Sequence, residues 1–203
     1  MTTTDKPKEL GVSRIKDDRV RFYLDNFKMI ETWAQIRADA NQELHDVFLD
    51  MGEALSAEAA DRGYSDVIVR VDEQTNPKKP RILITRRAWH GTNGEAPAAT
   101  AIEWHQPPID KSGELYLYVG VRVGDRRRRD VRVAKHLSSL APALRRKLGS
   151  TWQKEDENFP IWRWIEPQGD SLDEILLVGE ARRAAWACWE ATAHHIDDAL
   201  GEA

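Results

Sequence analysis

The alternation of apolar and polar residues is clearest in the segment 114–123, which reads ELYLYVGVRV. Successive side chains of a β-strand point to opposite faces of a sheet. One face of this segment therefore carries five aliphatic residues, which are Leu115, Leu117, Val119, Val121 and Val123. The other face carries Tyr116, Tyr118, Gly120 and Arg122. This period of two predicts a central strand of a sheet.

Four further segments have the composition of strands. Residues 65–72, 81–89 and 99–105 precede the central strand, and residues 159–165 follow it. The first four strands are joined by short links rich in turn-forming residues, whereas parallel strands need long crossover connections. We therefore expect an antiparallel meander. Gln106-Pro107-Pro108 is expected to end the pairing of the third strand, because proline has no N–H to donate.

The N-terminal part of the chain carries an apolar residue every three or four positions, which is typical of an amphipathic helix. The stripe extends over residues 17–62 and comprises Val20, Leu24, Phe27, Ile30, Trp33, Ala40, Leu44, Val47, Phe48, Met51 and Leu55. Gly63 is suited to a left-handed C-cap. An unbroken helix would be about 68 Å long at about 1.5 Å per residue. Either it breaks into a hairpin at Arg37–Gln42, or it projects and buries its stripe against a partner chain, which gives a dimer.

Two more helices are expected later in the chain. The first covers residues 133–148, and Pro142 either kinks it or divides it in two. The second covers residues 170–200, with Asp170 or Ser171 as its cap and Gly201 at its end. Its expected buried side comprises Leu172, Ile175, Leu176, Gly179, Trp186, Trp189, Ala193, Ile196 and Leu200.

These elements predict an α+β fold with an antiparallel or mixed sheet of four to five strands, covered by long N- and C-terminal helices. The two terminal helices are expected to be neighbours. Residues 1–16 form a flexible tail in this interpretation, and residues 17–203 form a single domain. Within it, residues 17–62 are helical, residues 65–165 hold the sheet with an inserted helix, and residues 170–200 form the last helix.

The composition suits a cytoplasmic globular protein. Of the 203 residues, 41% are hydrophobic and 32% are charged, which is too apolar for general disorder. No apolar run reaches the roughly 20 residues that span a bilayer, and the N-terminus lacks the apolar segment of a secretory signal. We therefore expect no membrane association. The single cysteine, Cys188, rules out an internal disulfide and a multi-cysteine zinc site.

Charge is unevenly distributed along the chain. Residues 114–149 carry ten basic and three acidic side chains, whereas residues 150–203 carry four and twelve. Either basic and acidic elements pair within the protein, or the basic segment binds an anionic partner. The candidate anion-binding or partner-binding residues are Arg122, Arg126, Arg127, Arg128, Arg129, Arg132, Lys135, Trp162, Arg163 and Trp164. Because the pI of about 5.9 is low for a dedicated nucleic-acid binder, an acidic protein surface explains the arginine run equally well.

Asp72, Glu103 and His105 are the candidate catalytic residues. Asp72 ends the first strand, and Glu103 and His105 share a face of the third. The order of elements is similar to that of the restriction-endonuclease-like fold, whose metal site uses an aspartate on one strand and a Glu-x-Lys on the next. This chain has His105 at the lysine position, one additional strand and no Pro-Asp pair before the glutamate. The resemblance therefore implies a degenerate fold of this kind without an intact catalytic motif.

Other residues with chemical potential have structural interpretations. His194 and His195 follow Glu190 on the last helix, but neighbouring helical positions point about 100° apart and do not readily share one ion. We predict no metal site and no cofactor. Cys188 is expected to be structural. Among the eight tryptophans, Trp33, Trp186 and Trp189 are expected in the core, while Trp104, Trp162 and Trp164 either pack in the core or line a contact surface.

The sequence thus leads us to expect a non-enzymatic interaction protein. It would self-associate through its helices as a homo-oligomer and engage an acidic partner through the arginine-rich turn. The alternative is a nucleic-acid-binding module.

Overall fold

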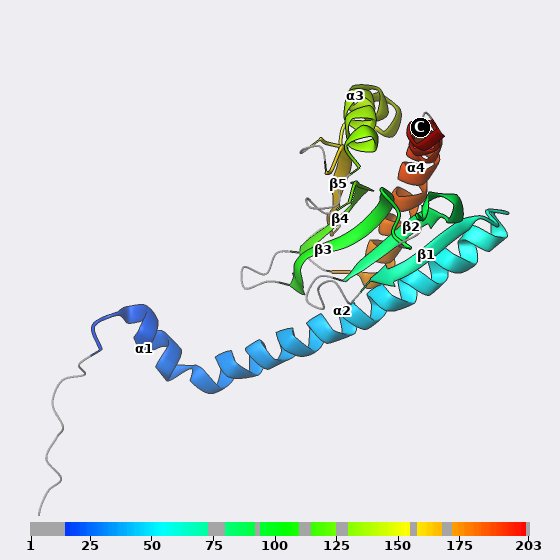
Figure 1. Ribbon diagram of the computed structural model, residues 1–203. Helices are drawn as coiled ribbons and strands as arrows, with labels where there is room; N and C mark the ends of the chain where they lie inside the picture. Colours follow the sequence, from blue (N-terminus) through cyan, green and yellow to red (C-terminus); the bar gives the residue numbers. More distant parts are fainter. Residues whose placement is uncertain are drawn as a thin grey trace, which may run out of the picture. The chain divides into compact units, whose positions relative to one another are not determined.

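The computed structural model describes residues 15–72, 80–91, 94–109, 115–124, 130–154, 158–167 and 172–201, with the backbone alone for residues 105–107 and 116 (Figure 1). The helices are α1 (Asp18–Asp25), α2 (Phe27–Asp61), the 3-10 helix η1 (Arg87–Trp89), α3 (Val131–Leu148) and α4 (Glu174–Gly201). The strands are β1 (Val67–Asp72), β2 (Arg81–Arg86), β3 (Ala99–Ile109), β4 (Leu115–Arg122) and β5 (Ile161–Ile165). The chain divides into two compact units, residues 1–39 and 40–203, and the division falls inside α2.

The five strands form one sheet in the order β1-β2-β3-β4-β5, and every neighbouring pair is antiparallel. The predicted α+β meander is therefore confirmed, including the fifth strand after the inserted helix. β4 pairs with β3 on one side and with β5 on the other. The segment predicted as a central strand is therefore an interior strand, whereas β3 occupies the centre of the five-stranded order.

One face of the sheet carries the hydrophobic core. Ile82, Ile102 and Val119 lie opposite one another on β2, β3 and β4, and all three are fully buried. α4 runs along this face in contact with β3 and β4 (Figure 1). α2 packs tightly here as well, because a Cβ atom on Gly52 would lie 2.5 Å from Val71 Cγ2.

The C-terminal part of α2 and helix α4 are neighbours, as the sequence predicted. Glu58 on α2 accepts hydrogen bonds from Arg182 and from Trp186 Nε1 on α4, the latter at 2.5 Å. Arg62 also pairs with Glu190 at 2.8 Å. These polar contacts join the two helices at the rim of the core that they cover.

Of the two alternatives for the N-terminal helix, the break into a hairpin at Arg37–Gln42 is not observed, because α2 continues through this segment. The helix is interrupted at Asn26 instead, where the side chain donates to the carbonyl of Phe22. Asn41 does not end the helix. Its side-chain amide connects α2 to β3, because it donates to Ile109 O at 3.0 Å and accepts from Ile109 N at 2.6 Å. A polar residue beside the apolar stripe therefore satisfies the backbone at the end of β3.

The C-terminus of α2 matches its prediction. Gly63 has a φ of 75°, and the N–H groups of Gly63 and Tyr64 donate to the carbonyls of Ala60 and Ala59. This pair of bonds is a Schellman cap, which places glycine in the left-handed conformation.

The prediction that β3 stops pairing at Gln106-Pro107-Pro108 is wrong in part. The register of β3 and β4 is irregular between Trp104 and Ile109, as prolines without N–H groups require. Pairing nevertheless resumes where Ile109 lies opposite Leu115, so β3 extends four residues beyond the expected end at His105.

α3 is one helix despite Pro142, and the Asp130 side chain caps it by accepting from the N–H groups of Arg132 and Val133. α4 begins at Glu174, where Asp173 accepts from Leu176 N at 3.0 Å. The expected caps Asp170 and Ser171 lie outside the described residues.

The prediction of the buried side of the last helix is correct from Trp186 onward and wrong in the first turn. Ile175 is 76% exposed and Leu176 is 49% exposed, whereas Leu177 is buried. The helix packs through a row of small residues that follows Leu177, namely Ala181, Ala184, Ala185, Cys188, Ala191 and Ala199. Alanine lets the helix axis approach the sheet closely, so bulk alone does not identify the buried side. Within the described residues, no helix combines the length and apolar character needed to cross a bilayer.

Candidate interaction surfaces

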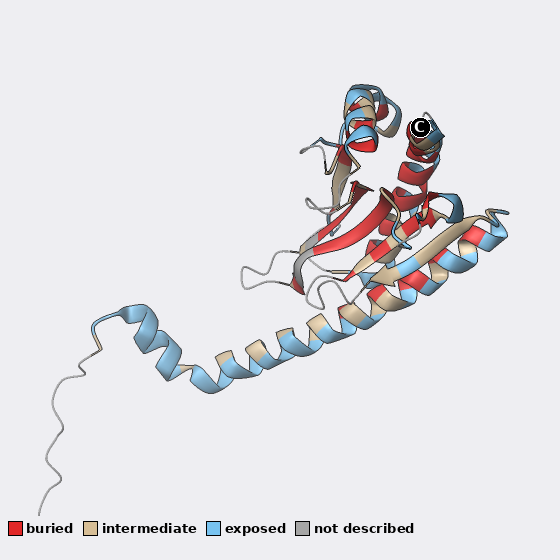
Figure 2. Cartoon of the chain, in the orientation of Figure 1, coloured by how far each residue is buried: buried red, intermediate tan, exposed pale blue. Residues whose placement is uncertain are grey.

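The N-terminal part of the helical segment exposes large apolar side chains. α1 has no buried residue, and the buried residues of α2 begin at Leu44 (Figure 2). We call the exposed set the N-terminal apolar surface: Val20, Phe22, Tyr23, Leu24, Phe27, Met29, Trp33 and Ile36, which are 41–64% exposed. The prediction that Trp33 is a core residue is wrong, because this residue is 64% exposed.

Contacts within residues 15–39 are local. Asp17 caps α1 by accepting from Arg19 N at 2.9 Å, and the Tyr23 hydroxyl of α1 donates to the Glu31 carboxylate of α2. Gln35 donates to Asp39 one turn later, at 2.7 Å. The Tyr23–Glu31 contact joins the two helices, and the apolar side chains stay exposed.

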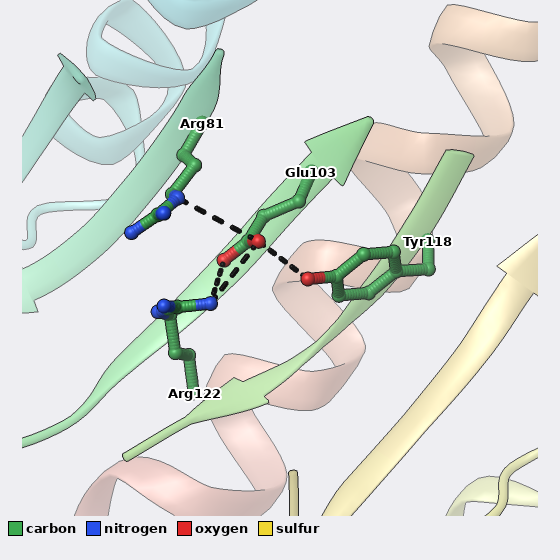
Figure 3. A network of polar contacts seen from close by, with 4 residues as sticks. All are labelled: Arg81, Glu103, Tyr118 and Arg122. Atoms are coloured by element: carbon green, nitrogen blue, oxygen red, sulfur yellow. Dashed lines mark hydrogen bonds and ion pairs between the residues drawn. The ribbon is translucent and has the colours of Figure 1, made fainter. Parts of the chain in front are cut away.

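The other notable arrangement is a buried carboxylate on the sheet face opposite the core (Figure 3). Glu103 of β3 is 5% exposed. Arg122 Nη1 donates to the two carboxylate oxygens of Glu103, Oε1 at 3.1 Å and Oε2 at 3.2 Å. Arg81 Nε lies 3.6 Å from Oε2. The Tyr118 hydroxyl donates to it as well. We call these four residues the polar centre.

The strand register builds the polar centre. Arg81 of β2 and Tyr118 of β4 lie directly opposite Glu103, one on each side. Burial, followed by the charge of Glu103, raises the pKa of Tyr118, so the phenol stays protonated and donates. Both oxygens of the carboxylate are engaged by cationic or hydroxyl donors, which is the arrangement of a paired structural charge.

The candidate catalytic residues are placed as follows. Asp72 of β1 lies opposite Arg81 of β2, and Arg81 lies opposite Glu103 of β3. The two acidic residues therefore share a sheet face, but the strand that carries Arg81 lies between them. The side chain of His105 lies outside the described ones. Among the described residues, no group of three or more His, Cys, Asp or Glu side chains is placed to hold a metal ion.

The candidate basic residues lie on different elements and faces. Arg122 belongs to the polar centre, whereas Arg163 lies on the helix-covered face, where it pairs with Glu180 of α4. Arg132 is 3.7 Å from its own cap residue Asp130, and Lys135 of α3 is exposed. The run Arg126–Arg129 lies outside the described residues.

Trp162 and Trp164 lie on the face of the polar centre, opposite Gly120 and Tyr118 respectively. Their ring centroids are 5.1 Å apart in an edge-to-face arrangement, and the Tyr118 ring is 5.8 Å from Trp164. Trp104 packs on the other face and is 2% exposed. The three tryptophans therefore do not share one surface, and the core interpretation of Trp104, Trp186 and Trp189 is confirmed.

Three histidines gather where α3 contacts α4. The rings of His194 and His195 are 3.8 Å apart between centroids, and the His136 ring of α3 is 6.1 Å from His195. Burial, then His194 and His136, lowers the pKa of His195, although Asp198 opposes the shift and Lys147 of α3 adds to it. Glu190 pairs with Arg62 rather than with these rings.

We expect the free energy of unfolding to fall as the pH drops from about 7 to about 5. Because the pKa of His195 is lowered in the folded protein, the unfolded chain takes up the proton first. The contribution of neutral His195 is thus fully present above the ordinary value of 6.5 and is lost as the pH falls through the folded pKa. Urea unfolding across this range should show a weaker pH dependence for His195→Gln than for the wild type.

Carboxylates affect the free energy of unfolding in a separate range, at lower pH. Arg183 and then Arg163 hold the pKa of Glu180 below its ordinary 4.5, against the effect of burial, so this stability is lost only below that value. An unchanged pH dependence in His195→Gln would assign the loss between about pH 7 and 5 to other groups.

Cys188 lies on α4 in the core and is fully buried, which confirms its structural interpretation. Burial raises the pKa of its thiol to about 12. The thiolate that reacts with oxidants and disulfides is therefore scarce at neutral pH.

Sequence reasoning missed Arg81 and Tyr118 as members of the polar centre. Both residues were inside expected strands, at the start of 81–89 and within 114–123. The signal was the antiparallel pairing itself, because opposite residues share a face once the register is known. The turn residues between the strands did not fix that register.

Comparison of the chain with known proteins finds no matching family model, no matching curated protein and no matching solved structure.

Proposed function

We propose that this protein is a non-enzymatic interaction protein that self-associates through its N-terminal apolar surface. The supporting observation is the exposure of eight large apolar side chains between Val20 and Ile36. Along α2 the same spacing of three and four residues continues from Ile30 and Trp33 to Leu44, Phe48 and Met51, which are buried in the core. One amphipathic pattern is thus used for internal packing at one end and is available for a partner at the other.

The exposed area is suitable for a stable interface. An aromatic side chain can bury roughly 150–250 Å², so four half-exposed aromatics and four half-exposed aliphatics offer on the order of 700 Å². A standard interface takes about 800 Å² from each partner. Monomeric proteins seldom expose more than a few hundred Å² in one apolar patch.

A second copy of this chain is the occupant that we propose. Residues 18–39 carry four basic and four acidic side chains, so two such segments meet without net repulsion. The apolar residues recur at helical spacing, as they do at the seams between paired helices.

Replacing Trp33 with glutamine is the direct test. Trp33 is the most exposed residue of the surface, and the loss of a tryptophan anchor commonly costs about 2 kcal/mol of binding, or roughly 30-fold in affinity. Size-exclusion chromatography with light scattering should give a dimer or larger oligomer for the wild type. The same measurement should show Trp33→Gln dissociating at concentrations where the wild type stays associated.

Ile175→Gln provides a matched control, because Ile175 is 76% exposed but belongs to α4. It should associate like the wild type. A wild-type protein that stays monomeric at the highest concentrations would overturn the proposal, and so would equal association of Trp33→Gln and the wild type.

The proposal retains an acidic partner for the arginine run Arg126–Arg129. Support comes from the sequence, in which residues 114–149 hold ten basic and three acidic side chains. Binding to an acidic polypeptide such as polyglutamate should weaken when these four arginines are replaced with glutamine. Unchanged binding would remove this part of the proposal. The cytoplasmic location stays a prediction.

Nucleic-acid binding is the second candidate, and one observation favours it. Trp162 and Trp164 share a sheet face with Arg122, and aromatic rings beside cationic groups are the usual contacts of single-stranded nucleic acids. Titration with single-stranded DNA across a salt series should then show affinity that falls steeply with salt. No binding at low salt would eliminate this candidate, including its degenerate restriction-endonuclease-like form.

A further inference from the structure

We infer that two copies of the chain pair with their N-terminal helical segments antiparallel, so that α1 of one copy lies beside the exposed N-terminal third of α2 of the other. This inference rests on the self-association proposed above and adds the direction of the pairing. It concerns residues 16–46, which contain the whole N-terminal apolar surface.

The charges of this segment differ between its two halves. Residues 16–28 carry four basic and three acidic side chains, whereas residues 29–46 carry one basic and four acidic. A parallel pair would place the two acidic halves together. An antiparallel pair places each acidic half beside the basic half of the other copy, and complementary charge fixes direction in helix pairing.

The contacts inside the segment let α1 take part in the pairing. The Tyr23 hydroxyl donates to Glu31, and Ile30 N donates to Asn26 O at 3.1 Å, so the chain continues from α1 into α2 with a hydrogen bond across the interruption. The aromatic residues on both sides of Asn26, Phe22 and Phe27, are about half exposed. Exposed aromatic side chains are therefore present on both helices.

Cysteine cross-linking distinguishes antiparallel from parallel pairing. We would prepare Phe22→Cys and Ile36→Cys separately, one with a size tag, then mix and oxidise them. Both positions are exposed and lie near opposite ends of the apolar surface, while the native Cys188 is buried with a thiol pKa near 12. Because a disulfide needs Cβ atoms within about 4.5 Å, we expect the mixed disulfide to exceed each self-pair by about fivefold or more.

Ser56→Cys is the matched control, because Ser56 is exposed on α2 outside the apolar surface and should cross-link at background level. Dominant self-pairs at positions 22 and 36, in a protein that light scattering finds associated, would overturn the antiparallel direction but not the self-association. An associated protein with no disulfide above the Ser56→Cys level would place the contact elsewhere and overturn the inference. A monomer in light scattering would overturn the proposed function itself.

Discussion

Replacing Glu103 with glutamine is expected to lower the free energy of unfolding by about 3–5 kcal/mol, the usual cost of removing one partner from a buried ion pair. The reason is the sharing of one carboxylate by Arg81 and Arg122, whose side chains are 14% and 16% exposed. Glutamine keeps the shape and can accept a hydrogen bond from Tyr118, but it removes the negative charge. Chemical unfolding in urea, followed by circular dichroism, measures the effect.

Two controls separate charge from hydrogen bonding. Tyr118→Phe removes a hydrogen bond to a charged group and should cost about 1.5–3 kcal/mol, which is less than the loss of the carboxylate. Glu53→Gln makes the same chemical change at an exposed position on α2 and should stay within about 0.5 kcal/mol of the wild type. If Glu103→Gln were as stable as Glu53→Gln, the polar centre would not be a structural ion pair. It would then have to be reconsidered as a ligand site.

The sequence predicted the elements of the fold because each element has its own period. The alternation in 114–123 and the three-to-four spacing in 17–62 depend on local chain geometry, and both are observed. Gly63 also acted as predicted, since a left-handed helix terminus depends on the residue at that position.

Features that depend on what lies opposite in space were not predictable from local patterns. Asn41 had the composition of a helix break, yet its amide has a backbone partner at Ile109, 68 positions away in the sequence. Trp33 continues an apolar stripe that is buried later in the same helix. The spacing of the stripe does not show at which residue the packing against the core begins. The polar centre likewise required the register of three strands before Arg81, Glu103 and Tyr118 could be recognised as neighbours.

Gly120 shows a constraint of the same kind, because β4 accepts no side chain at this position. A Cβ atom there would lie 2.5 Å from Ile161 O and from Trp162 Cβ, and 2.7 Å from Trp162 Cα. Two of these three atoms belong to the backbone of β5, so a side-chain rotation cannot relieve the overlap. β5 would have to move away from β4, its partner in the sheet.

Gly120→Ala is therefore expected to lower the free energy of unfolding by about 3 kcal/mol, at the upper end of the usual cost of overpacking. Amide hydrogen exchange should locate the damage, with faster exchange in β5 than in β1, because local opening exposes the amides of the displaced strand.

Gly179→Ala is the matched control. Its Cβ would meet only the flexible end of Arg183 at 3.4 Å inside α4, so it should raise stability by about 0.5–1 kcal/mol. Since the same methyl group is added in both variants, opposite signs would trace the cost to the approach of β5. Equal stability of Gly120→Ala and the wild type would show that β5 can shift without loss.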